Sequence, residues 1–269
     1  MADVVGVHGV GWQYQSRDKM AELWRQEIAK GLSSARSPRK GDFTFEAAFY
    51  GGLYRRPPGH KGLDSPDRLE PGLATEFVLE LAGGTPAEGT KVYLPRPAQW
   101  ALRTLQATDY FANVGHVALV RFANQVGRYF TDLQLREGAQ DEFVKAVGGG
   151  AKVVVAHSLG SVIAYDVLRQ EPRLDVDVLI TLGSPLGLRV IRERLGVLGN
   201  GRDNWPGQVR QWVNVAAEED AIALVKVLEP LYCQGIDDRP VRNSRMRAHL
   251  ATRYLNVVET SSVIADALA

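Results

Sequence analysis

The stretch VVVAHSLGSVIAYD, residues 153–166, changes its pattern abruptly around one serine. A run of valines, typical of a buried β-strand, leads into AHSLG (156–160), and an apolar helical pattern begins at once. Ser158 therefore falls at a sharp turn between a strand and a helix, and the small residues Ala156 and Gly160 let the two elements approach closely. This context is typical of a nucleophilic serine at the carboxyl end of a strand.

The short pattern alone is weak, because small residues at this spacing around a serine arise by chance about once in every few proteins of this size. A second match, GLSSA (31–35), follows a polar helical pattern and leads into the loop-like RSPRKGD (36–42). Since only Ser158 has the strand–turn–helix context, we identify it as the candidate nucleophile.

Short β-rich segments alternate with helical patterns along most of the chain. This alternation predicts an α/β fold with a mostly parallel central sheet of about six strands and helices on both faces. Pro240 favours an edge position for the last and weakest strand. The expected strands are DVVGVHG (3–9), FTFEAAFY (43–50), AKVVVAHS (151–158), DVLITLGSP (177–185), VRQWVNVAAE (209–218) and DRPVRNS (238–244).

Residues 63–147 lack a convincing strand, and we interpret them as a helical insertion within one domain spanning 1–269. In HVALVRFANQVGRYFTDLQL (116–135), a recurring apolar face predicts a helix packed on the sheet. Its residues are Leu119, Phe122, Val126, Phe130 and Leu133. The aromatic first half, PAQWALRTLQATDYFANVG (97–115), is the best candidate for a cap over the site. Its aromatic residues are Trp100, Tyr110 and Phe111.

The composition is that of an ordinary globular protein, with 269 residues, 45% hydrophobic residues and a formal net charge of +1. No broad basic field indicates a nucleic-acid partner, and the single cysteine, Cys233, cannot form an internal disulfide. The N-terminus lacks a signal-peptide pattern, and no apolar run approaches the ~20 residues needed to cross a bilayer. We therefore expect a cytoplasmic protein without a transmembrane segment; its oligomeric state stays unknown.

The sequence has no HExxH or CxxC motif and no cluster of histidines and carboxylates, so we predict neither a metal nor another cofactor. We interpret the basic GGLYRRPPGHKG (51–62) as a solvated loop rather than a site for a phosphate or carboxylate of the substrate.

A nucleophilic serine needs a base, and histidine is the usual one. The chain has five histidines: His8, His60, His116, His157 and His249. In strand–turn–helix hydrolases the catalytic residues follow the order serine, acid, histidine. His249 alone lies beyond the late carboxylates, so we choose it as the base over the alternative of a surface histidine that opens the last helix. It must be neutral to accept the serine proton.

The acid is expected just after the fifth strand, where Glu218, Glu219 and Asp220 stand. We choose Asp220 and place Glu218 second, although Asp220 would equally suit the N-cap of a helix. Asp237 and Asp238 are third choices, since they precede the last strand. The acid would orient the imidazole and stabilise its charged form.

The backbone amide of Leu159, at the start of the helix, is one expected oxyanion donor. The second should come from the loop after an early strand, and VHGVG (7–11) fits because its glycines let the backbone approach a ligand. We assign this donor to Val10, with Gly11 as the alternative, and treat His8 as structural. The residues expected to line the substrate site are Gly9, Gly11, Trp12 and His157.

Several of these segments together resemble the α/β-hydrolase superfamily, in the order VVGVHGVG, VVVAHSLGSVIAYDVL, LITLGSPLG, WVNVAAEEDAIA and AHLATRYL. The HSLGS turn and the GSP strand end are similar to its lipase-like branch, which includes intracellular phospholipases and GPI-inositol deacylase-like proteins. The resemblance covers the strands and their loops but not the insertion. It implies an ester-cleaving serine hydrolase with Ser158, Asp220 and His249 as its triad.

Three features depart from that family's pattern. Ala156 stands where glycine is usual, and Ala221 follows Asp220 where proline is frequent. The sheet is also expected to begin directly at the oxyanion strand, without the first two strands of the full fold.

Two classes of function follow from the sequence. The first is a carboxylic-ester hydrolase that acts on a small-molecule or lipid-like acyl ester. The second is an effector or binding module that uses a hydrolase fold with a weak site. The intact set of Ser158, Asp220 and His249 favours the first. Thioesterase, amidase or acyltransferase chemistry would use the same residues.

Overall fold

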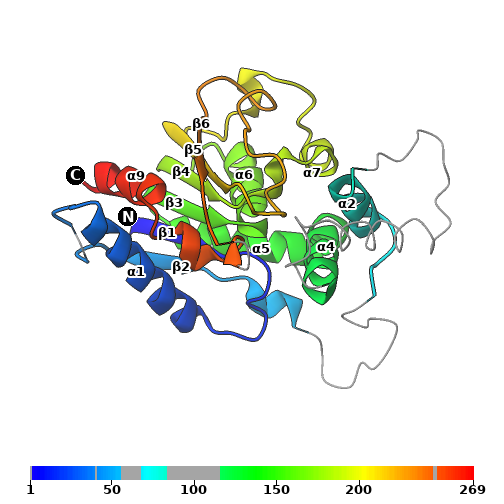
Figure 1. The fold of residues 1–269 in the computed structure, drawn as a ribbon, viewed down its shortest axis with the longest axis horizontal. Helices are drawn as coiled ribbons and strands as arrows, with labels where there is room; N and C mark the ends of the chain where they lie inside the picture. The colour runs from blue at the N-terminus through cyan, green and yellow to red at the C-terminus, as the bar shows by residue number, and fades with distance from the viewer. Residues whose placement is uncertain (1, 40, 56–67, 84–115, 245–246) are drawn as a thin grey trace.

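The fold is built on a parallel β-sheet, seen in a computed structural model that describes residues 2–39, 41–55, 68–83, 116–244 and 247–269. The six strands lie in the order β2-β1-β3-β4-β5-β6, and all neighbours are parallel (Figure 1). They are β1 (Ala2–Val7), β2 (Phe45–Ala48), β3 (Ala151–His157), β4 (Val176–Leu182), β5 (Gln211–Ala217) and β6 (Asp237–Val241). The predicted α/β fold is therefore confirmed, including the edge position of β6.

Strand β3 is buried on both faces. Its successive side chains point to opposite sides of the sheet, and each side is covered. Val153 and Val155 belong to an apolar cluster with α1 and α9. Val154 and Ala156 belong to a second cluster with α5 and α6 on the other face. Helices therefore cover both sides of the sheet (Figure 1). These helices are α1 (Arg17–Ser34), α5 (Leu133–Val147), α6 (Leu159–Gln170) and α9 (Val258–Leu268).

Helices α2 (Leu73–Leu81) and α4 (His116–Thr131) pack against each other on the side where the strands end (Figure 1). We expected the apolar face of residues 116–135 to lie on the sheet. Instead, α4 contacts mainly α2 and α5, and it is α5 that lies on β1 and β2. Periodicity identified the buried face correctly in Leu119, Phe122 and Val126, but it does not reveal which element covers that face.

Leu133 is a second departure from that expectation, because its side chain is 67% exposed. The helical pattern is not continuous there. Asp132 ends the connection from α4 and caps α5, accepting a hydrogen bond from the amide of Leu135 at 3.1 Å. Leu133 becomes the first residue of a new helix and leaves the apolar stripe. The aromatic segment at 97–115, which we proposed as a cap, lies outside the described residues.

A buried carboxylate joins the helix that begins at Ser158 to α4 and α5. Asp166 of α6 accepts hydrogen bonds from Tyr129 at 2.7 Å, Arg136 at 2.7 Å and Gln140 at 2.9 Å. Charge-assisted bonds to a buried carboxylate are among the stronger polar contacts in proteins. The network therefore fixes α4 relative to α6.

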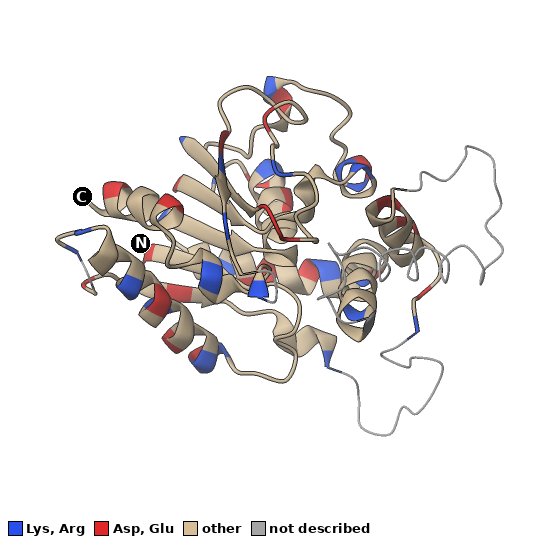
Figure 2. Ribbon diagram, in the orientation of Figure 1, with Lys and Arg blue, Asp and Glu red and all other residues tan. Residues whose placement is uncertain are grey.

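Acidic and basic residues are intermixed over the described chain, with both signs along α1 (Figure 2). None of the helices in the described ranges has the length and apolar character needed to cross a membrane. The short elements are η1 (Gly51–Tyr54), η2 (Pro185–Gly187), α7 (Arg189–Arg194), η3 (Arg202–Asn204) and α8 (Ala251–Tyr254).

Candidate active site

Ser158 occupies a strained turn between β3 and α6. Its backbone has φ 56° and ψ −127°, in a region that non-glycine residues rarely adopt. The turn is held because the Ser158 amide donates to the carbonyl of Leu182 at 2.9 Å. Gly160 is required one step later, since a Cβ there would overlap the carbonyl oxygens of Val7 and His8. The expected strand–turn–helix geometry is thus present at Ser158.

Ser158, His249 and Asp220 form a continuous hydrogen-bonded series. The Oγ of Ser158 lies 2.9 Å from Nε2 of His249. The Nδ1 of the same imidazole lies 2.8 Å from Oδ2 and 3.0 Å from Oδ1 of Asp220. The three residues come from the end of β3, the loop after β5 and the segment before α8. The structure therefore brings together the three residues chosen from the sequence.

Asp220 is fully buried, yet it is held as a carboxylate. Burial acts to raise its pKa, but the charge of His249 and hydrogen bonds from His249, Tyr254 and Ile222 outweigh burial and lower the pKa to about 2. The Tyr254 hydroxyl donates to Oδ2 at 2.6 Å, and the Ile222 amide donates to Oδ1 at 2.9 Å. Asp220 thus presents a fixed negative charge to the Nδ1 side of the imidazole.

The alternative acids have other partners. Glu218 pairs with Arg242 at the surface, and Asp237 pairs with Arg239. Asp238 accepts hydrogen bonds from the side-chain amide of Asn214 and from the backbone amides that follow Val227. Among these candidates, Asp220 is the one that contacts His249.

Tyr254 was not identified from the sequence. Its ring is fully buried in α8, and its hydroxyl accepts a hydrogen bond from the amide of Ala217 while it donates to Asp220. A buried tyrosine hydroxyl normally has a partner, but its identity depends on long-range folding. The sequence signal was only that of one more apolar position in a helix.

Gly183, at the end of β4, explains the glycine of the LGSP segment. Its φ is +53°, and a Cβ there would lie 2.8 Å from Oδ2 of Asp220 and 3.3 Å from Nδ1 of His249. The next residue, Ser184, is hydrogen-bonded through its Oγ to the Oγ of Ser161 at 2.7 Å. A side chain at position 183 would therefore displace the acid–histidine pair.

The loop after β1 lies against Ser158. A Cβ added at Gly9 would lie 2.6 Å from the Cβ of Ser158, so only glycine allows this approach. Val10 follows, partly buried, and Gly11 has a φ of +101°. The backbone amide of Leu159 is the first in α6, so it has no hydrogen-bond acceptor within the helix. The loop and the start of α6 thus flank Ser158, and the oxyanion role of Val10 and Leu159 stays a prediction.

Two residues predicted to line the substrate site, His157 and Trp12, also make contacts within the protein. His157 is buried, and its Nε2 lies 2.8 Å from the carbonyl oxygen of His249, so it holds the backbone at His249. Trp12 is partly buried against the apolar cluster of α1, with its ring 6.0 Å from that of His8. Their roles in substrate binding stay predictions.

His8 supports the loop, as expected. Its Nδ1 lies 2.7 Å from the carbonyl oxygen of Gly9, and its Nε2 accepts hydrogen bonds from the amides of Tyr50 and Gly51. These donors require an unprotonated Nε2. Burial lowers the pKa of His8 to about 3, and burial together with the charge of His249 lowers the pKa of His157 to about 3.

The two buried histidines predict that the protein loses stability in mild acid. Between pH 6.5 and 3 the unfolded chain binds protons that the folded protein excludes. The free energy of unfolding should therefore fall with decreasing pH, by about 1.4 kcal/mol per pH unit for each histidine. We expect urea denaturation to show a fall of roughly 2–3 kcal/mol between pH 6 and 5, and His157→Gln to remove about half of that slope. A flat stability profile between pH 6.5 and 4.5 would contradict the buried neutral state.

Helix α4 covers part of the site. The ring of Phe122 packs edge-on to the His249 imidazole, with centroids 5.9 Å apart. Ser158 has no exposed surface, whereas the His249 side chain is 27% exposed. The cover contributed by α4 was not predicted, because the pattern of 116–135 indicated only a buried face.

The described residues contain no group of three or more histidine, cysteine or acidic side chains placed to hold a metal ion. Comparison with known proteins found no matching family model, no matching curated protein and no matching solved structure.

Proposed function

We propose that this protein is a serine hydrolase that cleaves carboxylic esters, of lipid-like or other acyl type, and that it is a member of the α/β-hydrolase superfamily. The observation that carries the proposal is the hydrogen-bonded series from Ser158 Oγ through His249 to the buried Asp220. A serine hydroxyl at hydrogen-bond distance from an imidazole, which an acid orients in turn, is the arrangement that activates a serine.

The reaction follows from this geometry. Neutral His249 accepts the Ser158 proton at Nε2 while Oγ forms a bond to the ester carbonyl carbon. The resulting oxyanion is stabilised by the amides of Val10 and Leu159. The bond to the alkoxide oxygen then breaks, and that oxygen takes the proton from His249. Water repeats the sequence on the acyl-enzyme and releases the acid.

Asp220 stabilises the imidazolium that forms in both halves of the reaction. Its low pKa keeps it charged throughout the pH range in which a histidine base works. The burial of Ser158 and the cover by Phe122 limit water around the developing charge, which strengthens its interaction with the oxyanion donors.

A series of p-nitrophenyl esters of rising acyl length tests the proposal. We expect saturable release of p-nitrophenol, and a kcat/KM that falls toward acid pH because protonated His249 cannot accept the serine proton. Profiles should be measured where the protein stays folded. No release above background for any ester or thioester, by a protein shown to be folded, would contradict the proposal.

Tyr254→Phe is expected to lower kcat about 3- to 30-fold with little change in KM, because the loss of one hydrogen bond to a charged group weakens the hold on Asp220. Tyr165→Phe is the matched control, since that buried hydroxyl donates to the carbonyl of Asn204 at 2.8 Å. The acid limb of the pH–rate profile should shift in Tyr254→Phe only. Equal effects of both variants would indicate a purely structural role.

A further inference from the structure

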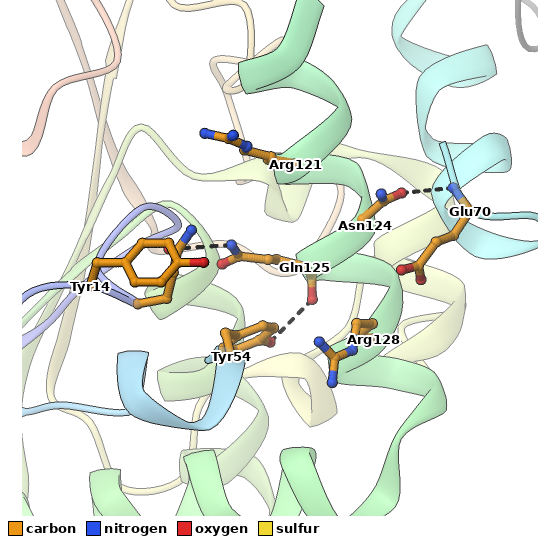
Figure 3. Close-up of a pocket in the computed structure, with 8 residues that line it drawn as sticks. Tyr14, Tyr54, Glu70, Arg121, Asn124, Gln125 and Arg128 are labelled. Carbon is orange, nitrogen blue, oxygen red and sulfur yellow. Dashed lines mark hydrogen bonds between the residues drawn. The ribbon is translucent and has the colours of Figure 1, made fainter. Parts of the chain in front are cut away.

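A cavity of about 220 Å³ lies between α4, η1 and the continuation of the loop after β1. The same loop reaches Ser158 at Gly9, and the same helix reaches His249 at Phe122. Figure 3 shows its residues: Arg121 and Gln125 extend from α4 toward Tyr14, and Tyr54 lies below them. Gln13 also lines it. The cavity is polar in character, unlike the apolar pocket that a neutral acyl chain requires.

The cavity lies within reach of a substrate bound at Ser158. Gly9 touches the nucleophile, and Gln13 lines the cavity four residues later, which places Gln13 at most about 14 Å along the chain from Gly9. On the other wall, Phe122 packs on His249, and Arg121 precedes it on α4. A molecule with a short chain can therefore span the two places.

The charge of this wall is positive. Helix α4 carries Arg121 and Arg128 and no acidic residue, and Figure 2 shows basic colour alone on it. Arg128 lies over the Tyr54 ring and 3.6 Å from Asp132. Arg121 is exposed, and within the described ranges it has no recorded ion pair or hydrogen bond. The lining also contains one acidic residue, Glu70, which lies across α4 from Tyr14 (Figure 3), so the two arginines exceed it by one charge.

The neighbouring polar groups are bonded to one another. The Tyr54 hydroxyl donates to the carbonyl of Gln125 at 3.1 Å, and the Gln125 amide lies 3.5 Å from the side-chain oxygen of Gln13. The guanidinium groups of Arg121 and Arg128 also line the space, and Arg128 shares its charge with Asp132. Guanidinium groups bind carboxylate and phosphate through paired, charge-assisted hydrogen bonds.

We infer that this cavity binds an anionic group, a carboxylate or a phosphate, at the non-reacting end of the ester substrate, with Arg121 as its main contact. The inference rests on the proposed function and narrows its substrate class. A wholly apolar chain in the cavity would remove water from Arg121 without replacing its hydrogen bonds, which is unfavourable.

Three p-nitrophenyl esters of matched length test it: the hexanoate, the mono-ester of adipate and the ester of 5-phosphonopentanoate. We expect wild-type kcat/KM to be at least about tenfold higher for one or both anionic esters. Arg121→Gln should lower kcat/KM for the preferred anionic ester about 10- to 100-fold and change that for the hexanoate less than about twofold. Preference for the carboxylate, the phosphonate or both identifies the anion.

Arg210→Gln is the matched control, because that arginine is paired with Asp177 at the surface before β5. Arg121→Lys should keep part of the preference, since it retains the charge but not the paired donors. Equal use of all three esters by wild type, or an equal loss for all three in Arg121→Gln, would overturn the inference and leave the proposed function standing.

A binding measurement separates the two proposals. Calorimetric titration of Ser158→Ala with monomethyl adipate and with propyl phosphate requires no hydrolysis. Binding of either compound that weakens at least about tenfold on adding Arg121→Gln supports the anion site even if no ester is cleaved. Absence of binding by both compounds, together with no preference among the esters, would overturn it.

Discussion

Replacing Ser158 with alanine is expected to abolish ester hydrolysis, with a loss in kcat on the order of 10⁶-fold. Among the described residues, the Ser158 hydroxyl is the group hydrogen-bonded to Nε2 of His249, at 2.9 Å, and alanine removes it. The substitution removes one oxygen atom and leaves the turn to be held by the Ser158 amide and by Gly160. We therefore expect the free energy of unfolding to change by less than about 1–2 kcal/mol.

The measurement compares p-nitrophenyl ester hydrolysis and urea unfolding for wild type, Ser158→Ala and Ser33→Ala. Ser33 is a matched control because it lies in GLSSA (31–35), the second match to the short pattern, and its hydroxyl donates to the Ala29 carbonyl in α1. Ser33→Ala should keep full activity. A folded Ser158→Ala protein that hydrolyses esters at more than about a hundredth of the wild-type rate would exclude Ser158 as the nucleophile.

Asp220→Asn is expected to lower kcat about 10⁴-fold. The carboxylate accepts from His249, Tyr254 and the Ile222 amide, and it has no donor of its own. An asparagine places an amide group among these donors. If that group faces Nδ1 of His249, the imidazole must carry its proton on Nε2 and can no longer accept one from Ser158.

Asp237→Asn provides the comparison, because this carboxylate pairs with Arg239 and does not contact His249. We expect its kcat to stay within about threefold of wild type, since partly exposed ion pairs contribute little. Circular dichroism and urea unfolding must show that Asp220→Asn is folded. A folded Asp220→Asn variant with more than about a tenth of wild-type kcat would contradict the role of the acid.

The sheet could be predicted because each strand has a signal in its own short stretch of sequence. The valine run of β3 is buried on both faces, and Pro240 marks β6 as an edge strand. The placement of α4 could not be predicted in this way. Its apolar period specifies a buried face equally well against a sheet or against another helix. The exposure of Leu133 depended on a single cap at Asp132, which interrupts an otherwise continuous pattern.

The candidate site was predictable where chain order and a strained turn constrain it. Ser158, Asp220 and His249 follow from the strand–turn–helix pattern and from the few late carboxylates and histidines, and the structure places them in contact. Tyr254 and Gly183 could not be found, because each matters only through contacts with residues distant in the sequence. The contact of His157 with the backbone carbonyl of His249 could not be predicted for the same reason.

The most direct test of the central claim is covalent labelling with a fluorophosphonate, followed by intact-mass and peptide mass spectrometry. The reagent reacts with a serine whose hydroxyl is activated by a neighbouring base and whose oxyanion is stabilised. The account predicts a single adduct on Ser158, formed in the wild-type protein and absent in His249→Asn. A folded wild-type protein that acquires no adduct, or that is labelled on a different serine, would contradict it.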